Sequence, residues 1–266
     1  ICRDAKFSSI IFPEGFRYIG GWTFAGCREL KFIVIPESVE KINHATFLGC
    51  SNLEDVYCMS PTPPAMGSEY TFNELSKEAL LHVPDPAAYE DWEPYFAAVE
   101  RQNTLASGTC GENANWSLTN GVLTINGTGD MESYYLENGE DRHGPWHALK
   151  EQIYHVIIDE GITSVGDYAF YDCSSLTSVT IPNSVTSIGC GAFEGCTGLT
   201  SISIPFVGQK AVGVGSPHFG HIFGANIYRQ NNSYVPASLQ TVIITGGTRI
   251  DENAFYECTG LTSIFI

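Results

Sequence analysis

Apolar residues in this chain recur at fixed intervals instead of forming long uninterrupted runs. Between residues 169 and 205 the same series appears twice, 23 residues apart: Phe170, Cys173, Leu176, Val179 and Ile181, then Phe193, Cys196, Leu199, Ile202 and Ile204. At its end the series alternates, with Val179 and Ile181 on one side of the chain and Ser178 and Thr180 on the other. This alternation predicts a short β-strand with one buried face.

The unit repeats along most of the sequence, in two blocks at roughly 1–58 and 150–266. Further copies begin at Phe24, Phe47 and Phe255, and a degenerate copy covers residues 153–165. One short strand cannot bury its apolar face alone, so we expect the units to stack in parallel and share one core. A proline such as Pro182 ends each strand, and we expect later apolar residues to turn back into the core.

The unit Ala-Phe-x-x-Cys-x-x-Leu-x-x-Val-x-Ile-Pro resembles the BspA-type leucine-rich repeat of bacterial surface proteins. The resemblance implies a leucine-rich-repeat solenoid of the α/β class, rich in β-structure, with short parallel strands and short helical or 3₁₀ turns. It also implies an extracellular or cell-surface location and a role in adhesion. The expected partner is then a host extracellular protein.

Two segments between the blocks resemble the caps of such arrays. Residues 107–131 place apolar positions on both sides of Asn120-Gly121, a strong signal for a β-hairpin. From Leu80 a strand is followed by a short helix whose first turn holds Pro86. We therefore expect two modules: array A at 1–58 with a closing cap at 59–103, and a hairpin cap at 104–149 with array B at 150–266.

The outward-facing strand positions differ between the arrays. Array B carries serine and threonine there, whereas array A carries Ile11, Phe32, Val34 and Tyr57. These four residues predict an apolar stripe, which is typical of a contact surface. Either a separate partner binds the stripe, or the segment 59–103 or the second module covers it.

Array B also departs from the 23-residue spacing, with an insertion at about 206–238. Long insertions in repeats often lie on a binding face. Four aromatic residues of the insertion, Phe219, Phe223, Tyr228 and Tyr234, are candidates for binding a carbohydrate. A third possibility is that the arrays serve as a structural spacer in a larger surface protein.

Charge narrows the choice of partner. Thirty acidic and 13 basic residues give a net charge of −17, which repels nucleic acid, and no apolar run is long enough for membrane insertion. The chain has no initiator methionine and starts and stops within repeat-like sequence, so we expect it to be a segment of a longer protein.

The sequence predicts neither an enzyme nor a cofactor or metal. His143, His147, Glu151 and His155 have helical spacing, but Pro145 interrupts it. Of nine cysteines, five share one repeat position, where we expect buried free thiols. Any disulfide would join members of the remaining set, Cys2, Cys58, Cys110 and Cys190. The resulting hypothesis is a non-enzymatic protein-binding module.

Overall fold

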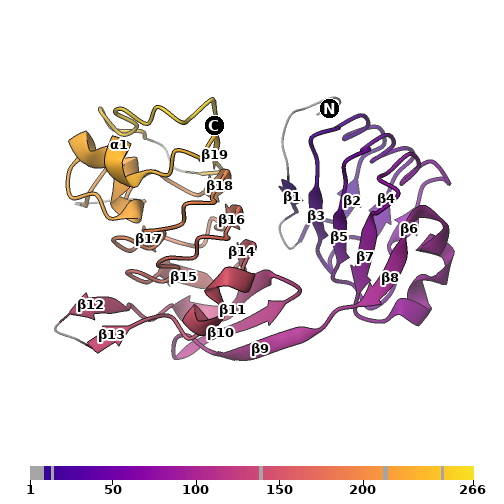
Figure 1. The fold of residues 1–266 in the computed structure, drawn as a ribbon, viewed down its shortest axis with the longest axis horizontal. Coiled ribbons are helices and arrows are strands. Elements are labelled where there is room, and N and C mark those ends of the chain that lie inside the picture. The colour runs from indigo at the N-terminus through magenta and orange to yellow at the C-terminus, as the bar shows by residue number, and fades with distance from the viewer. Residues whose placement is uncertain (1–8, 13–14, 138–139, 212–214, 247–248) are drawn as a thin grey trace. The chain divides into compact units, whose positions relative to one another are not determined.

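A computed structural model describes residues 9–12, 15–137, 140–211, 215–246 and 249–266. The chain forms two compact units, Ile1–Asn103 (unit 1) and Thr104–Ile266 (unit 2) (Figure 1). Both are β-rich coils of short strands joined by tight turns, which confirms the predicted solenoid. No helix in the described part of the chain has the length and apolar character needed to cross a membrane.

Unit 1 is a stack of coils with a parallel sheet on each of two sides. The five-stranded sheet contains, in order, β1 (Ser9–Ile11), β3 (Phe32–Ile35), β5 (Asp55–Cys58), β7 (Leu80–Val83) and β8 (Ala98–Arg101). The three-stranded sheet contains β2 (Tyr18–Ile19), β4 (Lys41–Ile42) and β6 (Ala65–Met66). Ile10, Ile33 and Val56 are aligned across β1, β3 and β5, so each coil places the same repeat position above the last.

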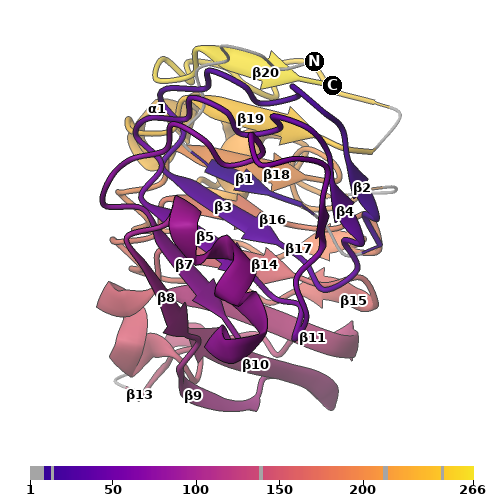
Figure 2. The ribbon, with the colours of Figure 1, turned by 90° about the vertical axis from the view of Figure 1, so that its right-hand side faces the viewer.

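Unit 2 follows the same plan over more coils. Its main sheet contains β9 (Thr104–Thr109), β10 (Asn113–Thr119), β11 (Val122–Asp130), β14 (His155–Ile158), β16 (Ser178–Thr180), β18 (Ser201–Ile204), β19 (Thr241–Ile244) and β20 (Ser263–Phe265). Strands β14, β16, β18, β19 and β20 follow one another along the unit (Figure 2). The last residues of β11 pair with β15 (Ile162–Val165), which pairs with β17 (Ser187–Ile188), while β12 (Tyr135–Glu137) and β13 (Glu140–Arg142) form a separate hairpin.

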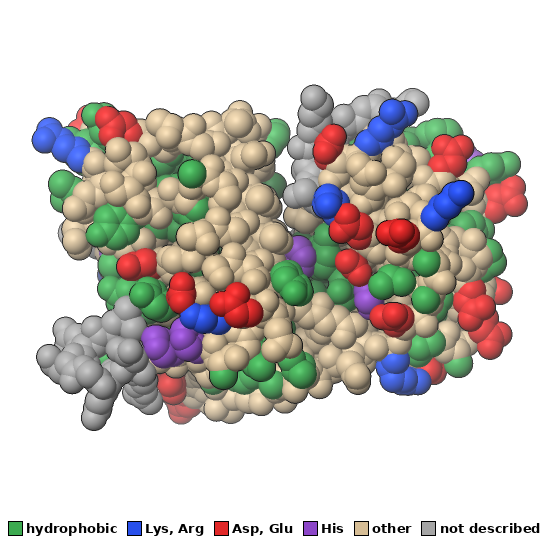
Figure 3. All heavy atoms as spheres, viewed as in Figure 1, with side chains coloured by type: hydrophobic (Ala, Val, Ile, Leu, Met, Phe, Trp, Pro, Cys, Tyr) green, Lys and Arg blue, Asp and Glu red, His purple; other side chains and the backbone are tan. Residues whose placement is uncertain are grey.

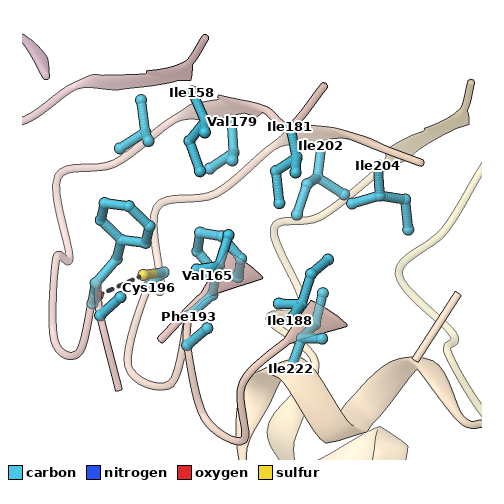
Figure 4. Packing of buried hydrophobic residues seen from close by; sticks show 14 of the residues in the cluster. Ile158, Val165, Val179, Ile181, Ile188, Phe193, Cys196, Ile202, Ile204 and Ile222 are labelled. Atoms are coloured by element: carbon cyan, nitrogen blue, oxygen red, sulfur yellow. Dashed lines mark hydrogen bonds between the residues drawn. The ribbon is translucent and has the colours of Figure 1, made fainter. Parts of the chain in front are cut away.

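The cores consist of ladders of similar apolar side chains. In unit 2 Val156, Val179, Ile202 and Val242 are aligned on successive strands, and each is at most 2% exposed. Val185 and Ile188 also turn inward, as the repeat pattern predicts. Figure 4 shows Val179, Ile202 and Ile204 of the main sheet, and Ile181 directly after β16, pointing into the same interior as Ile188 and Phe193. Sharing one core among coils is what makes each short strand stable.

The hairpin at the start of unit 2 is confirmed. β10 and β11 pair antiparallel around Asn120 and Gly121, whose φ angles of 47° and 81° are those of the tight turn that the Asn-Gly pair favours. Trp116 lies on β10, is buried, and meets Trp146 with ring centroids 5.8 Å apart. Trp146 precedes the 3₁₀ helix η2 (His147–Gln152), so the hairpin covers the first coil of the core.

The far end of unit 1 differs in detail from the sequence prediction. Instead of one regular helix, Pro86–Tyr95 forms a 3₁₀ helix, η1, interrupted at Tyr89 and containing Pro94. Pro94 cannot donate the backbone hydrogen bond of a regular helix, which limits the segment to short turns. Tyr89 and Trp92 are still buried against the last coil, and the chain then adds β8, which the pattern did not predict.

The cysteines of the repeat position are free thiols, and two of them hydrogen-bond to the preceding coil. Cys50 donates its thiol to the carbonyl of Phe24 at 3.2 Å, and Cys196 donates to the carbonyl of Phe170 at the same distance. Each thiol thus ties one coil to the preceding coil. All cysteines within the described residues are free, including Cys58, Cys110 and Cys190, while Cys2 lies outside those residues.

Buried thiols of this kind are expected to resist alkylation. Burial raises the pKa of the Cys50 and Cys173 thiols to about 12, so almost no reactive thiolate forms at pH 8. Peptide mapping after iodoacetamide treatment should find both residues unmodified in the folded protein and fully modified in denaturant. A reducing agent should leave the melting temperature unchanged. Rapid modification of Cys50 or Cys173 in the folded protein would contradict the ladder.

Candidate binding surfaces

The structure brings together the four predicted stripe residues of unit 1. Ile11, Val34 and Tyr57 are aligned across β1, β3 and β5, and Phe32 lies on the same face two residues before Val34. The ring centroids of Phe32 and Tyr57 are 5.0 Å apart, and Tyr57 stacks on His82 at 4.3 Å. His82 Nε2 lies 2.7 Å from Asp55 Oδ1, so one polar pair is built into this apolar row.

The sequence analysis left two alternatives for the stripe: a separate partner binds it, or another part of the chain covers it. Phe32, Val34 and Tyr57 are 7%, 2% and 5% exposed, and Ile11 is half-buried. The spacing of adjacent strands, about 4.8 Å, contributes to this low exposure, because it lets each large ring cover its neighbours in the row. Whether these residues bind a partner stays a prediction.

Two of the four aromatic residues of the insertion are buried, although the sequence analysis made them candidates for binding a carbohydrate. Phe219 and Phe223 are fully buried, because η3 (Phe219–Phe223) turns both rings into the core of unit 2. Their ring centroids lie 5.0 Å from Phe255 and 6.3 Å from Phe193, respectively. They therefore continue the phenylalanine ladder through the lengthened coil, and they are unavailable to a carbohydrate.

The other two aromatic residues of the insertion lie at the surface. Tyr228 is half-buried in η4 (Tyr228–Gln230), with the guanidinium of Arg229 5.6 Å from its ring and Tyr256 at its edge. Tyr234, at the end of the helix α1 (Asn231–Tyr234), is 36% exposed. A groove of about 400 Å³ lies beside Tyr228 and is lined by Pro217, His218, Ile227, Tyr228, Arg229 and Glu252.

Asn231 holds this region in place. Its side chain is fully buried, its Oδ1 accepts hydrogen bonds from the Gly220 backbone N–H at 3.1 Å and from His218 Nδ1 at 3.2 Å, and its Nδ2 donates to the Ala254 carbonyl. Burial lowers the pKa of His218, which is consistent with a neutral ring donating from Nδ1. Asn231 therefore ties η3 to the following coil.

Replacing Asn231 with alanine is expected to lower the free energy of unfolding by about 1–3 kcal/mol, because buried donors and acceptors lose their partner. Hydrogen exchange should become faster in residues 216–236 before it changes elsewhere in unit 2. The exposed neighbour Asn232 provides the matched control, since Asn232→Ala should leave exchange unaltered. Equal exchange in the Asn231 variant and the wild-type protein would show that the insertion is held by other contacts.

Exposed aromatic residues of unit 1 were missed by the sequence analysis. Phe16, Tyr18, Trp22 and Tyr70 are 41%, 58%, 43% and 44% exposed. Trp22 and Tyr70 stand two residues before the ladder phenylalanines Phe24 and Phe72, a position that the repeat pattern leaves unspecified. A comparison of that position between repeats would have singled them out.

The polar residues with helical spacing in the sequence make separate contacts in the structure. The rings of His143 and His147 stack at 3.7 Å, whereas Glu151 accepts from Ser174 and His155 approaches the hydroxyl of Ser178 at 2.6 Å. Within the described ranges, no three His, Cys, Asp or Glu side chains are arranged to hold a metal ion. Asp and Glu side chains are scattered over the face shown in Figure 3 and outnumber Lys and Arg.

The stacked coils, parallel strands and thiol ladder define a leucine-rich-repeat protein. The chain belongs to the BspA-type leucine-rich-repeat family: the family model matches in six copies, over residues 2–84, 149–212 and 228–266. No curated protein matches the sequence.

Solved structures of leucine-rich-repeat proteins are similar to this chain. One from Eubacterium ventriosum is 28% identical over 60% of this chain and 44% of its own, with a TM-score of 0.37. A leucine-rich cell surface protein from Faecalibacterium prausnitzii is 18% identical over 97% of this chain and 59% of its own, with a TM-score of 0.30. A leucine-rich repeat protein from Bacteroides ovatus is 21% identical over 97% of this chain and 61% of its own, with a TM-score of 0.31. The chain thus spans less than two thirds of each of these proteins.

Proposed function

We propose that this chain is a non-enzymatic binding module that acts at a bacterial cell surface or in secreted form and adheres to a partner outside the cell. The supporting observation is the set of large aromatic side chains exposed on unit 1: Phe16 and Tyr18, before and in β2, and Trp22 and Tyr70 on turns. Exposed aromatic side chains on a rigid scaffold are typical anchors of binding surfaces.

A host extracellular protein is the first candidate partner. The net charge of −17 argues against nucleic acid and favours a partner that is neutral or basic. A glycan is the second candidate, favoured by the groove beside Tyr228, whose lining also includes the charged residues Arg229 and Glu252. Arg229 and Glu252 could hydrogen-bond the hydroxyl groups of a sugar that stacks on the ring.

Biolayer interferometry tests the proposal with the 1–266 chain over immobilised matrix proteins and glycans. We expect saturable binding to at least one of them, weakened about tenfold in the double variant Phe16→Ser and Tyr18→Ser. Tyr154→Ser is the control, because Tyr154 is a comparably exposed tyrosine (48%) on unit 2. An absence of saturable binding to the whole panel would favour the spacer interpretation instead.

A further inference from the structure

Three side chains on the turns of unit 1 form a continuous exposed row, the Trp22–His44–Tyr70 row. The ring centroids of Trp22 and His44 are 5.4 Å apart, and those of His44 and Tyr70 are 5.7 Å apart. The ring planes are inclined at 57° and 64°, so Trp22 and His44 are tilted against each other and His44 and Tyr70 meet edge to face. The row extends over three successive coils, and all three side chains are exposed.

The backbone at Trp22 is held in a conformation that does not suit its side chain. Two residues before the ladder phenylalanine, five coils have left-handed φ angles between 52° and 60°, at Trp22, Ala45, Tyr168, Gly191 and Asn253. Glycine and asparagine adopt this region readily, whereas a large side chain is strained there. Trp22 accepts this strain while 43% of the side chain stays exposed, which suggests a use other than packing.

The turns that carry the row are tied to one another. Thr46 Oγ1 donates to the carbonyls of Gly20 at 3.0 Å and Asn43 at 2.8 Å, and Thr71 Oγ1 donates to Asn43 at 3.1 Å. The Trp22 backbone N–H also donates to the His44 carbonyl at 3.0 Å. A ligand that binds the row therefore meets a surface that is already ordered, which reduces the entropy lost on binding.

The chemistry around the row favours an uncharged ligand. Segments 20–23, 43–46 and 67–71 contain one charged residue, Glu69, among glycine, serine, threonine, asparagine and alanine. A phosphate-bearing or sulfated chain would need lysine or arginine beside it. A sugar ring presents C–H groups that pack on the electron-rich face of an aromatic ring, and its hydroxyls need only neutral donors and acceptors.

We propose that the Trp22–His44–Tyr70 row binds a neutral glycan chain that lies across three coils, with the Trp22 indole as the main stacking surface. This inference rests on the proposed adhesive function and specifies the class of partner for one surface of unit 1. It assigns the row a ligand of uncharged sugars, distinct from any ligand of the groove beside Tyr228.

An array of neutral and charged oligosaccharides, followed by calorimetric titration of the best binder, tests the proposal on the 1–266 chain. Trp22→Asn removes the indole and places a residue that suits the left-handed backbone. We therefore expect about tenfold weaker binding together with a melting temperature raised by about 2–4 °C. Tyr70→Ser should also weaken binding, and it does so at a position whose backbone is not left-handed.

Tyr168→Asn is the matched control, because Tyr168 occupies the same left-handed repeat position in unit 2. Its glycan affinity should equal that of the wild-type chain. The proposal fails if no neutral glycan binds, if Trp22→Asn retains affinity within about twofold, or if this variant melts at a lower temperature. Binding to a matrix protein but to no glycan would leave the adhesive function standing, whereas binding to neither would remove both.

Discussion

Replacing Phe47 with alanine is expected to lower the free energy of unfolding of unit 1 by about 3–5 kcal/mol. Phe47 is fully buried and stacks between Phe24 and Phe72, with ring centroids 5.5 Å away on each side and interplanar angles of 9° and 6°. Removing the ring leaves a cavity in the middle of the ladder. Each coil contacts only its neighbours, so the loss interrupts the stack on both sides.

Chemical denaturation followed by circular dichroism measures the loss, and hydrogen exchange locates it in residues 15–103. Phe16→Ala is the control, since Phe16 belongs to the same unit but is 41% exposed. The control should change stability by less than about 1 kcal/mol. A loss of similar size in both variants would mean that the phenylalanine ladder does not hold the coils together.

Replacing Trp146 with alanine should destabilise unit 2 to a similar extent, by about 3–5 kcal/mol. Trp146 is 1% exposed, stacks on Phe170 at 5.3 Å, and donates its indole N–H to the Ala169 carbonyl at 3.0 Å. It also meets Trp116 of the hairpin. The ring therefore joins the hairpin to the first coil, and its loss should open that end of the core.

Trp146→Phe separates the two contributions of the indole. It keeps most of the ring packing and loses the hydrogen bond, so we expect a smaller loss of about 1–2 kcal/mol. Exchange rates in unit 1 serve as the internal reference in both variants. If hydrogen exchange in the β10–β11 hairpin were as slow in the Trp146→Ala variant as in the wild-type protein, other contacts would hold the hairpin in place.

The repeat pattern predicted the core better than the surface. Val179, Ile181, Val185 and Ile188 face inward because alternation along a strand and the return of the coil both follow from spacing alone. Phe219 and Phe223 were assigned to a binding face because the lengthened coil breaks the 23-residue interval. Their role as ladder residues depends on a 3₁₀ turn that has no periodic signal.

The candidate surfaces depend on features that a linear pattern does not contain. Phe32 and Tyr57 stand at alternating strand positions typical of an outer face, and only the structure shows that their rings contact each other across strands. A comparison between repeats would reveal the tryptophan at position 22, but the left-handed backbone at that position is visible only in the structure. Glycine, asparagine, alanine, tyrosine and tryptophan all occur at this position, so the residue types alone do not predict its conformation.

Backbone hydrogen bonds between neighbouring coils also determine how this protein responds to force. Thr177 donates to Tyr154 and Thr200 donates to Thr177, so each coil is fastened to the one before it, 23 residues earlier. Tension applied to one end should peel coils off in sequence, and each 23-residue coil would release a tether of about 75 Å. A repeat protein built in this way would lengthen under load in small steps.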